Sequence, residues 1–291
     1  MGRGGDFAVE QACLNLKVPL GNGLNLTFGL FDTPFCYEKF DSWQNPNYSR
    51  SYGHSIMPVQ HTGLVGAYRF SEWMTLAAGV ANTCNSLING RPYRAGPTPA
   101  AESEKTYVAA LYLSAPESLG CLKGANLTFV IGSGLNGSNA PTASRITAYS
   151  VNGNVPLPLK GLSVGAAYDY VGTTLHGAVG PFYANASALY LMYQATEKVK
   201  FNNRVEYASA TSGIWTSVLG AARTKPAGGE KFLGETFTID YQLWQNVISR
   251  AEFRWDHDLT ARRGVAAPFG GGPTDGDKNA LSVALNLVFR F

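Results

Sequence analysis

The sequence contains no run of about 18 apolar residues, although 45% of its 291 residues are hydrophobic. We therefore expect no transmembrane helix. Charged residues make up only 15% of the chain, well below the roughly 25% of a typical soluble domain. No segment has a convincing 3.6-residue period, and the opening MGRGGDFAVE lacks the apolar core of a signal peptide. The chain is thus poor in charged residues although we expect no transmembrane helices, which are the usual reason for such a composition.

Charge and cysteine content exclude two further classes of function. The net charge is +3 and the basic residues are not clustered, so nucleic-acid binding is not expected. The four cysteines are too far apart in the sequence for a zinc site: Cys13, Cys36, Cys84 and Cys121. We expect free thiols, although three disulfide pairings remain open on paper. No metal or other cofactor is predicted.

Motifs for enzyme chemistry are scarce. GSGLNG (132–137) fits a dinucleotide-binding pattern, but SNAPTAS and another strand follow it where a helix is needed. No GxSxG elbow is present. WDHD (255–258) places Asp256 and His257 at the end of a strand. A barrel hydrolase using this rim Asp/His pair is kept as an alternative to a merely polar rim.

What the sequence does contain is period-two alternation, the pattern of β-strands. Most candidate strands have 8–11 residues, near the roughly 9–11 that cross a bilayer at a steep tilt. We predict thirteen strands, at about 7–18, 24–31, 61–70, 75–82, 105–114, 125–132, 144–152, 162–171, 185–195, 199–209, 232–241, 247–256 and 278–291.

The connections between these strands alternate in length. Short ones lie at 19–23, 71–74, 196–198 and 242–246, and long ones at 32–60, 83–104, 210–231 and 257–277. Short turns at one end and long loops at the other are typical of outer-membrane barrels. We therefore predict an all-β fold, an antiparallel transmembrane β-barrel.

The two faces of the strands differ in polarity. In 247–256, one face carries Val247, Ala251, Phe253 and Trp255, and the other Arg250, Glu252, Arg254 and Asp256. On the apolar face, rings gather toward the strand ends and aliphatic residues lie between them, which favours a lipid-facing surface with two aromatic girdles. The last strand, LSVALNLVFRF (281–291), alternates to its end. Leu285 and Phe291 are expected to face lipid, and Asn286 and Arg290 the interior.

Strand direction leads to an expectation about the whole protein. The first and the last predicted strands run the same way, so they cannot close an antiparallel sheet, and bacterial single-chain barrels have even strand numbers. We expect residues 1–291 to be a single barrel domain, the C-terminal portion of a longer porin of about sixteen strands that lacks its N-terminal strands here.

One stretch resembles a known family. VPLGNGL followed by GLFDTPFCYE, then NPNYSRSY and the HTG opening the next strand, all within residues 6–72, are similar to the OmpL-like β-barrel porin family, BBP2. The specific motifs cover about a quarter of the chain. Cys36 departs from the pattern, which has glycine there. The resemblance implies a water-filled outer-membrane pore in a Gram-negative bacterium.

Residues that could define the pore follow from these faces. The pore-lining candidates are Lys17, Asn25, Arg69, Asp169, Lys200, Arg204, Glu206, Arg250, Glu252, Arg254 and Arg290. With Asp240 and Asp256 included, seven positive and five negative wall charges indicate a weak anion preference. The longest connection, 32–60, is the candidate constriction loop, with Tyr37, Glu38, Lys39, Asp41, Trp43 and Arg50. An ordinary extracellular loop is the alternative.

The predicted function is passive diffusion of small polar solutes or ions through an outer-membrane porin, not an enzyme. The partners are outer-membrane lipid and those solutes. A homo-oligomer is left open, because no residue pattern decides it. The alternatives are the rim hydrolase described above and a non-conducting structural or adhesive barrel, which a plugged lumen would favour.

Overall fold

The strand prediction is confirmed. A computed structural model describes residues 9–84, 104–135, 145–174, 182–211, 215, 229–260, 269 and 277–290. Within them, thirteen strands form one antiparallel sheet in which each strand pairs with its neighbours in sequence. The strands are β1 (Ala12–Val18), β2 (Leu24–Asp32), β3 (Gln60–Arg69), β4 (Met74–Ala81), β5 (Thr106–Ser114), β6 (Asn126–Leu135), β7 (Arg145–Pro156), β8 (Leu162–Thr174), β9 (Phe182–Gln194), β10 (Val199–Ala210), β11 (Glu230–Trp244), β12 (Val247–Asp258) and β13 (Asn279–Phe289).

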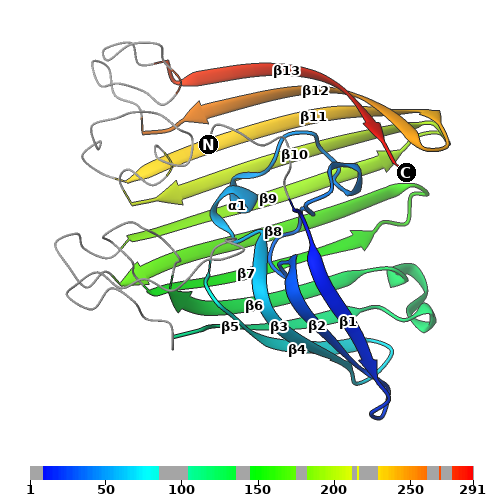
Figure 1. Cartoon of the computed structure of the whole chain (residues 1–291). Coiled ribbons are helices and arrows are strands. Elements are labelled where there is room, and N and C mark those ends of the chain that lie inside the picture. Colours follow the sequence, from blue (N-terminus) through cyan, green and yellow to red (C-terminus); the bar gives the residue numbers. More distant parts are fainter. Residues whose placement is uncertain are drawn as a thin grey trace.

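The sheet curves strongly, and its connections separate by length. Figure 1 shows β1–β4 coming round in front of β6–β8, with the tight connections at one end of the strands. Short helices with described bounds lie in the connections: η1 (Ser42–Gln44), α1 (Tyr52–Ile56) and η2 (Glu117–Leu122). Within the described residues, no helix is both long and apolar enough to span a bilayer.

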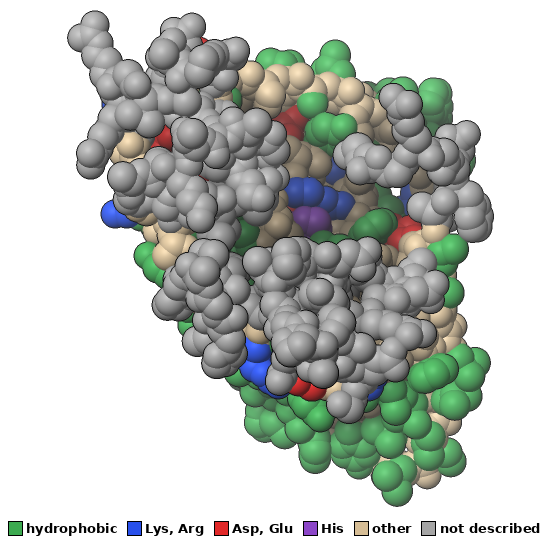
Figure 2. Space-filling model, turned by 60° about the vertical axis from the view of Figure 1, so that its left-hand side comes forward, with side chains coloured by type: hydrophobic (Ala, Val, Ile, Leu, Met, Phe, Trp, Pro, Cys, Tyr) green, Lys and Arg blue, Asp and Glu red, His purple; other side chains and the backbone are tan. Residues whose placement is uncertain are grey.

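The predicted orientation of the faces is also confirmed. Leu285 on β13 is 81% exposed and Phe28 on β2 is 62% exposed, whereas Arg204 on β10 is 0% and Arg250 on β12 is 2% exposed. Hydrophobic side chains cover the flank of the molecule, and charged ones show inside the mouth (Figure 2). Such an apolar exterior is stable only against hydrocarbon, because a water-facing patch of this extent would aggregate.

Aromatic side chains mark both ends of this outer surface. Trp73 and Trp244 are exposed at the short-connection end. Phe253 is exposed toward the other end, and Tyr170 there stacks on Tyr149 with ring centroids 4.5 Å apart. Amphipathic rings favour the headgroup level, so the exterior has the girdles that the sequence predicted. Phe291 and most of the predicted loops 83–104 and 210–231 lie outside the described residues.

Glycines allow the tight curl of β1–β4. Gly29 on β2 pairs with Gly63 on β3, and a Cβ at Gly63 would clash with the backbone of β4 at Val80. Gly29 has φ +122, which L-residues with side chains avoid. Glycine inside a strand commonly marks such a bend.

Within the described residues, no ladder joins the two outermost strands. β1 and β13 are the ends of the thirteen-strand order and run in the same direction. The single 1–291 domain, the missing N-terminal strands and the total of about sixteen therefore stay predictions. All four cysteines are free thiols in this structure.

Candidate functional site

The connection between β2 and β3 folds into the concave side of the sheet. We call residues 33–59 the lumenal segment; it contains η1 and α1. Figure 1 shows it in front of β8–β11, and α1 contacts β8, β9 and β10. The predicted constriction loop thus lies within the barrel lumen, against one part of the wall.

Three arginines of the wall hold the backbone of the lumenal segment. Arg204 donates to the carbonyl O of Ser49 at 2.6 Å, and Arg254 donates to that of Arg50 at 2.7 Å. Arg250 donates to the carbonyl O atoms of Ser42 and Asn45 at 2.8 and 2.7 Å. Planar guanidinium groups suit this task because each offers five N–H donors in a fixed geometry.

Carboxylates of the wall hold the N–H groups of the same segment. Glu252 accepts hydrogen bonds from the backbone N–H of Tyr48 at 2.6 Å and of Ser49 at 2.9 Å. Glu206 accepts one from Tyr52 N–H at 3.1 Å. A segment with little regular structure must pair its buried backbone groups with other partners, and here the wall supplies both donors and acceptors.

The wall charges also neutralise one another and the segment. Arg204 forms ion pairs with Glu206 at 3.1 Å and with Glu38 of the segment at 2.7 Å. Arg250 pairs with Asp240 at 2.8 Å. Arg254 pairs with Asp256 at 2.8 Å and lies over the Tyr52 ring, 5.2 Å from its centroid. Buried charges persist only when paired in this way.

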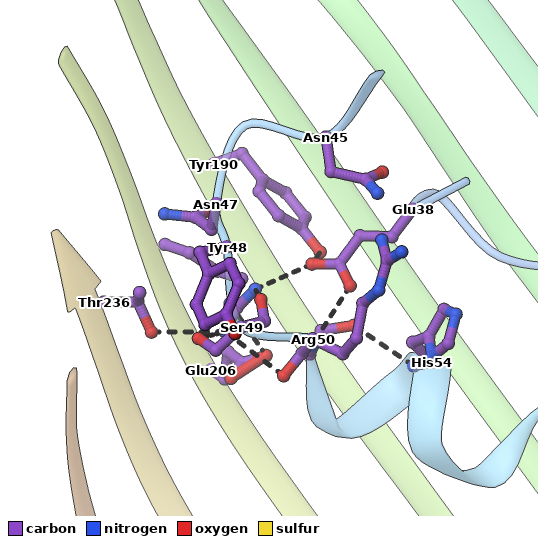
Figure 3. Close-up of polar contacts among 12 residues, drawn as sticks. Glu38, Asn45, Asn47, Tyr48, Ser49, Arg50, His54, Tyr190, Glu206 and Thr236 are labelled. Atoms are coloured by element: carbon purple, nitrogen blue, oxygen red, sulfur yellow. Dashed lines mark hydrogen bonds and ion pairs between the residues drawn. The ribbon is translucent and has the colours of Figure 1, made fainter. Parts of the chain in front are cut away.

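The acidic side chain of Glu38 links the segment to a second part of the wall. Glu38 accepts hydrogen bonds from Ser51 N–H at 2.9 Å and from the Tyr190 hydroxyl at 3.2 Å (Figure 3). The Tyr190 ring stacks on Tyr37 with centroids 4.2 Å apart. Burial, and then the charge of Glu38, raises the pKa of Tyr37 to about 12, so the Tyr37 phenol stays neutral.

An apolar cluster fills the lumen beside the α1 helix. Tyr52 packs against Trp215 at 5.3 Å and Phe232 at 6.0 Å between ring centroids, and Phe232 packs against Phe269 at 5.9 Å. Trp215 follows β10 and Phe269 follows β12 in the sequence, so single residues from distant parts of the chain join this cluster. This cluster occupies space on the concave side of the sheet.

Two features of the segment show how closely it fits. A Cβ on Gly53 of α1 would overlap the carboxylate of Asp169 on β8, so only glycine allows this approach. Cys36 has φ +69, the left-handed conformation that glycine favours. This left-handed backbone is a physical reason for the glycine that the family pattern has at this position.

The structure separates the predicted pore-lining residues into two groups. Arg204, Glu206, Arg250, Glu252 and Arg254 face inward but are covered by the segment they bind, and Asp169 lies beneath α1. The others face inward in the half of the barrel near the short connections: Lys17, Asn25, Arg69, Lys200 and Arg290. The role of both groups in solute passage stays a prediction.

The candidate residues of the lumenal segment also fall into two groups, those that hold the segment in place and those that lie exposed or half-buried. Glu38 and Tyr37 anchor it, and Arg50 ties it to itself by donating to the carbonyl O atoms of Lys39, at 2.7 Å, and Phe40. Lys39 and Trp43 are exposed, Asp41 is half-buried, and Arg290 lies over the Trp43 ring at 5.0 Å. Near Trp43 and Asn45 a hollow of about 410 Å³ opens beside Lys198 and Lys200.

Sequence reasoning missed several residues of this site. Asn47, whose amide donates to Thr238 at 2.8 Å, and Ser49, Tyr52 and Tyr190 were not singled out as site residues. Asn47, Ser49 and Tyr52 fall in or beside NPNYSRSY, a polar stretch whose density of hydrogen-bonding groups was the available signal. Among the described residues, no three His, Cys, Asp or Glu side chains are grouped as a metal site.

The rim Asp/His pair is not a catalytic dyad. Asp256 faces inward, where it accepts from Arg254 and the Tyr52 hydroxyl. His257, the next residue on β12, faces outward beside Trp255, and its Nδ1 lies 2.8 Å from Asn279 Oδ1. Neighbouring residues of a strand point to opposite faces, so the hydrolase alternative does not fit this geometry.

Comparison with known proteins agrees with the fold. The model of the family described as "Putative beta-barrel porin-2, OmpL-like" matches residues 2–291. Its match covers essentially the whole chain, so the protein belongs to this OmpL-like porin family, whose members are outer-membrane β-barrels of bacteria. No curated protein sequence matches the chain.

Solved structures show the same architecture. The anion-selective porin from Comamonas acidovorans has a TM-score of 0.64 at 9% identity, with 96% of this chain and 77% of that chain covered. The trimer form of OmpT, an outer-membrane protein of Vibrio cholerae, has a TM-score of 0.57 at 14% identity, with 98% and 80% covered. OccAB4 of Acinetobacter baumannii has 0.52 at 10%, with 95% and 65% covered. At these identities the likeness concerns the fold alone.

Proposed function

We propose that this protein is a diffusion porin, without enzymatic activity, through which small polar solutes pass between the lumenal segment and the uncovered part of the wall. The observation that carries the proposal is the anchored segment itself. A polar segment is held by buried arginines and carboxylates inside a barrel of a porin family. Such an anchored segment sets the width and the charge of a passage, because pore-lining side chains select solutes by size and field.

A preference for anions follows from the basic residues that form no ion pair among the described residues. Arg204, Arg250 and Arg254 are paired with carboxylates. Lys17, Arg69, Lys200 and Arg290 face inward near the short connections, and the ion pairs found among the described residues do not include them. Basic groups at one mouth raise the local concentration of anions. The anion-selective Comamonas porin with the same fold is consistent with this proposal.

The test is current through the intact protein inserted in a planar bilayer. We expect a steady, ohmic conductance, and a larger one for Glu38→Gln, which frees part of the lumenal segment. An inserted, folded barrel that passes no current would overturn the proposal. The aromatic cluster around Tyr52 and Trp215 favours a second candidate, a non-conducting barrel, and that outcome would support it. A self-associating porin, as the trimeric Vibrio protein is, forms part of the proposal.

A further inference from the structure

The outer wall carries a groove that the porin function does not use. It has a volume of about 920 Å³ and is almost wholly apolar. Its lining includes Leu127 of β6, Val151 of β7, and Ala166 and Tyr168 of β8. Leu127 and Tyr168 belong to the exposed, lipid-facing side of the sheet, so the groove opens outward and not into the lumen.

The connection between β5 and β6 forms the other side of this groove. It is not a tight turn: η2 (Glu117–Leu122) lies against β7, and Leu119 and Leu122 line the groove. Small residues on the facing wall, Gly153 and Ala166, make it deep. Figure 1 places this connection at the end of the sheet that carries the short turns.

The groove runs from the headgroup level into the hydrocarbon. Trp73 and Asn126 lie at its short-connection end, and it reaches Val151, four residues along β7 from Val155. Four residues of strand correspond to about 13 Å. The groove thus follows the direction of a lipid chain and begins where the aromatic girdle marks the membrane surface.

Basic residues lie in the two connections that adjoin the short-connection end of the groove. Lys123 directly follows η2, and its exposed ion pair with Glu117, at 2.5 Å, is of a kind that contributes little and exchanges readily. Lys160 lies in the connection between β7 and β8 and is exposed. Two ammonium groups in the connections that flank an apolar groove match a phosphate carried at the head of an acyl chain.

We propose that this groove binds a phospholipid of the leaflet on the short-connection side, with one acyl chain between η2 and β7 and its phosphate near Lys123 and Lys160. A narrow apolar groove open to hydrocarbon fits a linear chain. The proposal rests on the outer-membrane location and on the outer face of the wall, not on conduction, so it stands or falls separately from the porin function.

The first test counts bound lipid. The protein is reconstituted in vesicles of phosphatidylethanolamine and phosphatidylglycerol, extracted in mild detergent and weighed by native mass spectrometry. Wild type is expected to retain phospholipid. Ala166→Phe, which fills the groove, is expected to retain about tenfold less, as roughly 1.4 kcal/mol of lost contact would give. Ala251→Phe, on the exposed outer face of β12, is the matched control and should behave as wild type.

A second measurement separates the competing outcomes. The fluorescence of Trp73 is obtained as the difference between wild type and Trp73→Phe. Phospholipid brominated along its acyl chain should quench this Trp73 fluorescence, and Ala166→Phe should reduce the quenching. Lys123→Gln with Lys160→Gln should lower retention of phosphatidylglycerol. Equal retention in wild type, Ala166→Phe and Ala251→Phe would overturn the proposal. So would a change of oligomeric mass in Ala166→Phe with unchanged lipid, because the groove would then hold a second copy of this chain.

Discussion

Arg204 of β10 and Glu38 of the lumenal segment, 166 residues apart in sequence, form an ion pair of 2.7 Å between two side chains that are almost completely buried. The pair joins the part of the chain that folds inward to the part that receives it. Removal of one partner would destabilise the docked segment strongly, because the remaining charge would be left buried and unpaired.

Substitution of this arginine should therefore release the segment. Arg204→Met leaves Glu38 and Glu206 without their closest cation, a loss of about 3–5 kcal/mol for a buried pair. Maleimide labelling reports the release, because Cys36 is buried and burial raises the pKa of its thiol, whereas Cys121 is exposed. Wild type should label Cys121 quickly and Cys36 slowly.

In Arg204→Met, Cys36 should label at a rate approaching that of Cys121, with the barrel still folded. Lys123→Gln, which removes an exposed charge outside the lumen, is the matched control and should leave Cys36 protected. Continued protection of Cys36 in Arg204→Met would mean that the remaining anchors suffice.

The left-handed backbone at Cys36 yields a second prediction. A residue with a Cβ pays about 1–2 kcal/mol in this conformation, so Cys36→Gly should match or raise the thermal unfolding temperature despite losing a buried sulfur. Cys36→Val should lower it, since a β-branched side chain fits this conformation least. A lower unfolding temperature for Cys36→Gly than for Cys36→Val would contradict the left-handed backbone conformation at this position.

Acidification should loosen the segment through His54. Burial, and then the nearby cations Arg50 and Arg204, lower the pKa of His54, although Glu38 acts in the opposite direction. A released segment then binds more protons than a docked one, so docking is fully stable above the ordinary pKa of about 6.5 and weakens as the pH falls below it. Current fluctuations should increase from pH 7.5 toward about pH 5, and less so in His54→Gln. Identical pH profiles for the two proteins would exclude His54 as the cause.

The selectivity for anions over cations should depend on the inward-facing basic residues that form no ion pair among the described residues. Lys200→Gln and Arg290→Gln should each lower the ratio of anion to cation permeability by about twofold, as expected for a screened charge at a water-filled mouth. The zero-current potential in a KCl gradient measures this ratio. Lys160→Gln, at the same end but outside the lumen, should leave the ratio unchanged. An unchanged ratio in both lumenal variants would place the selective charges elsewhere.

The strands and their faces could be predicted because alternation is a local property. Phe28 and Leu285 are apolar in an alternating pattern, and nothing distant is needed to assign their side. The lumenal segment was predicted from its length and polarity. Its path was not, because contacts such as Arg250 with Ser42 join residues 208 apart in sequence. The groove beside η2 was missed for the same reason, since Leu119 and Ala166 meet only in the folded wall.

The anchors of the lumenal segment bind mainly its peptide groups, through the carbonyl oxygens of Ser42, Asn45, Ser49 and Arg50 and the amides of Tyr48 and Ser49. Exposed side chains of the segment, such as Lys39 and Gln44, make none of these hydrogen bonds. Substitutions at those positions can therefore change the exposed surface of the segment while its attachment to the wall is preserved.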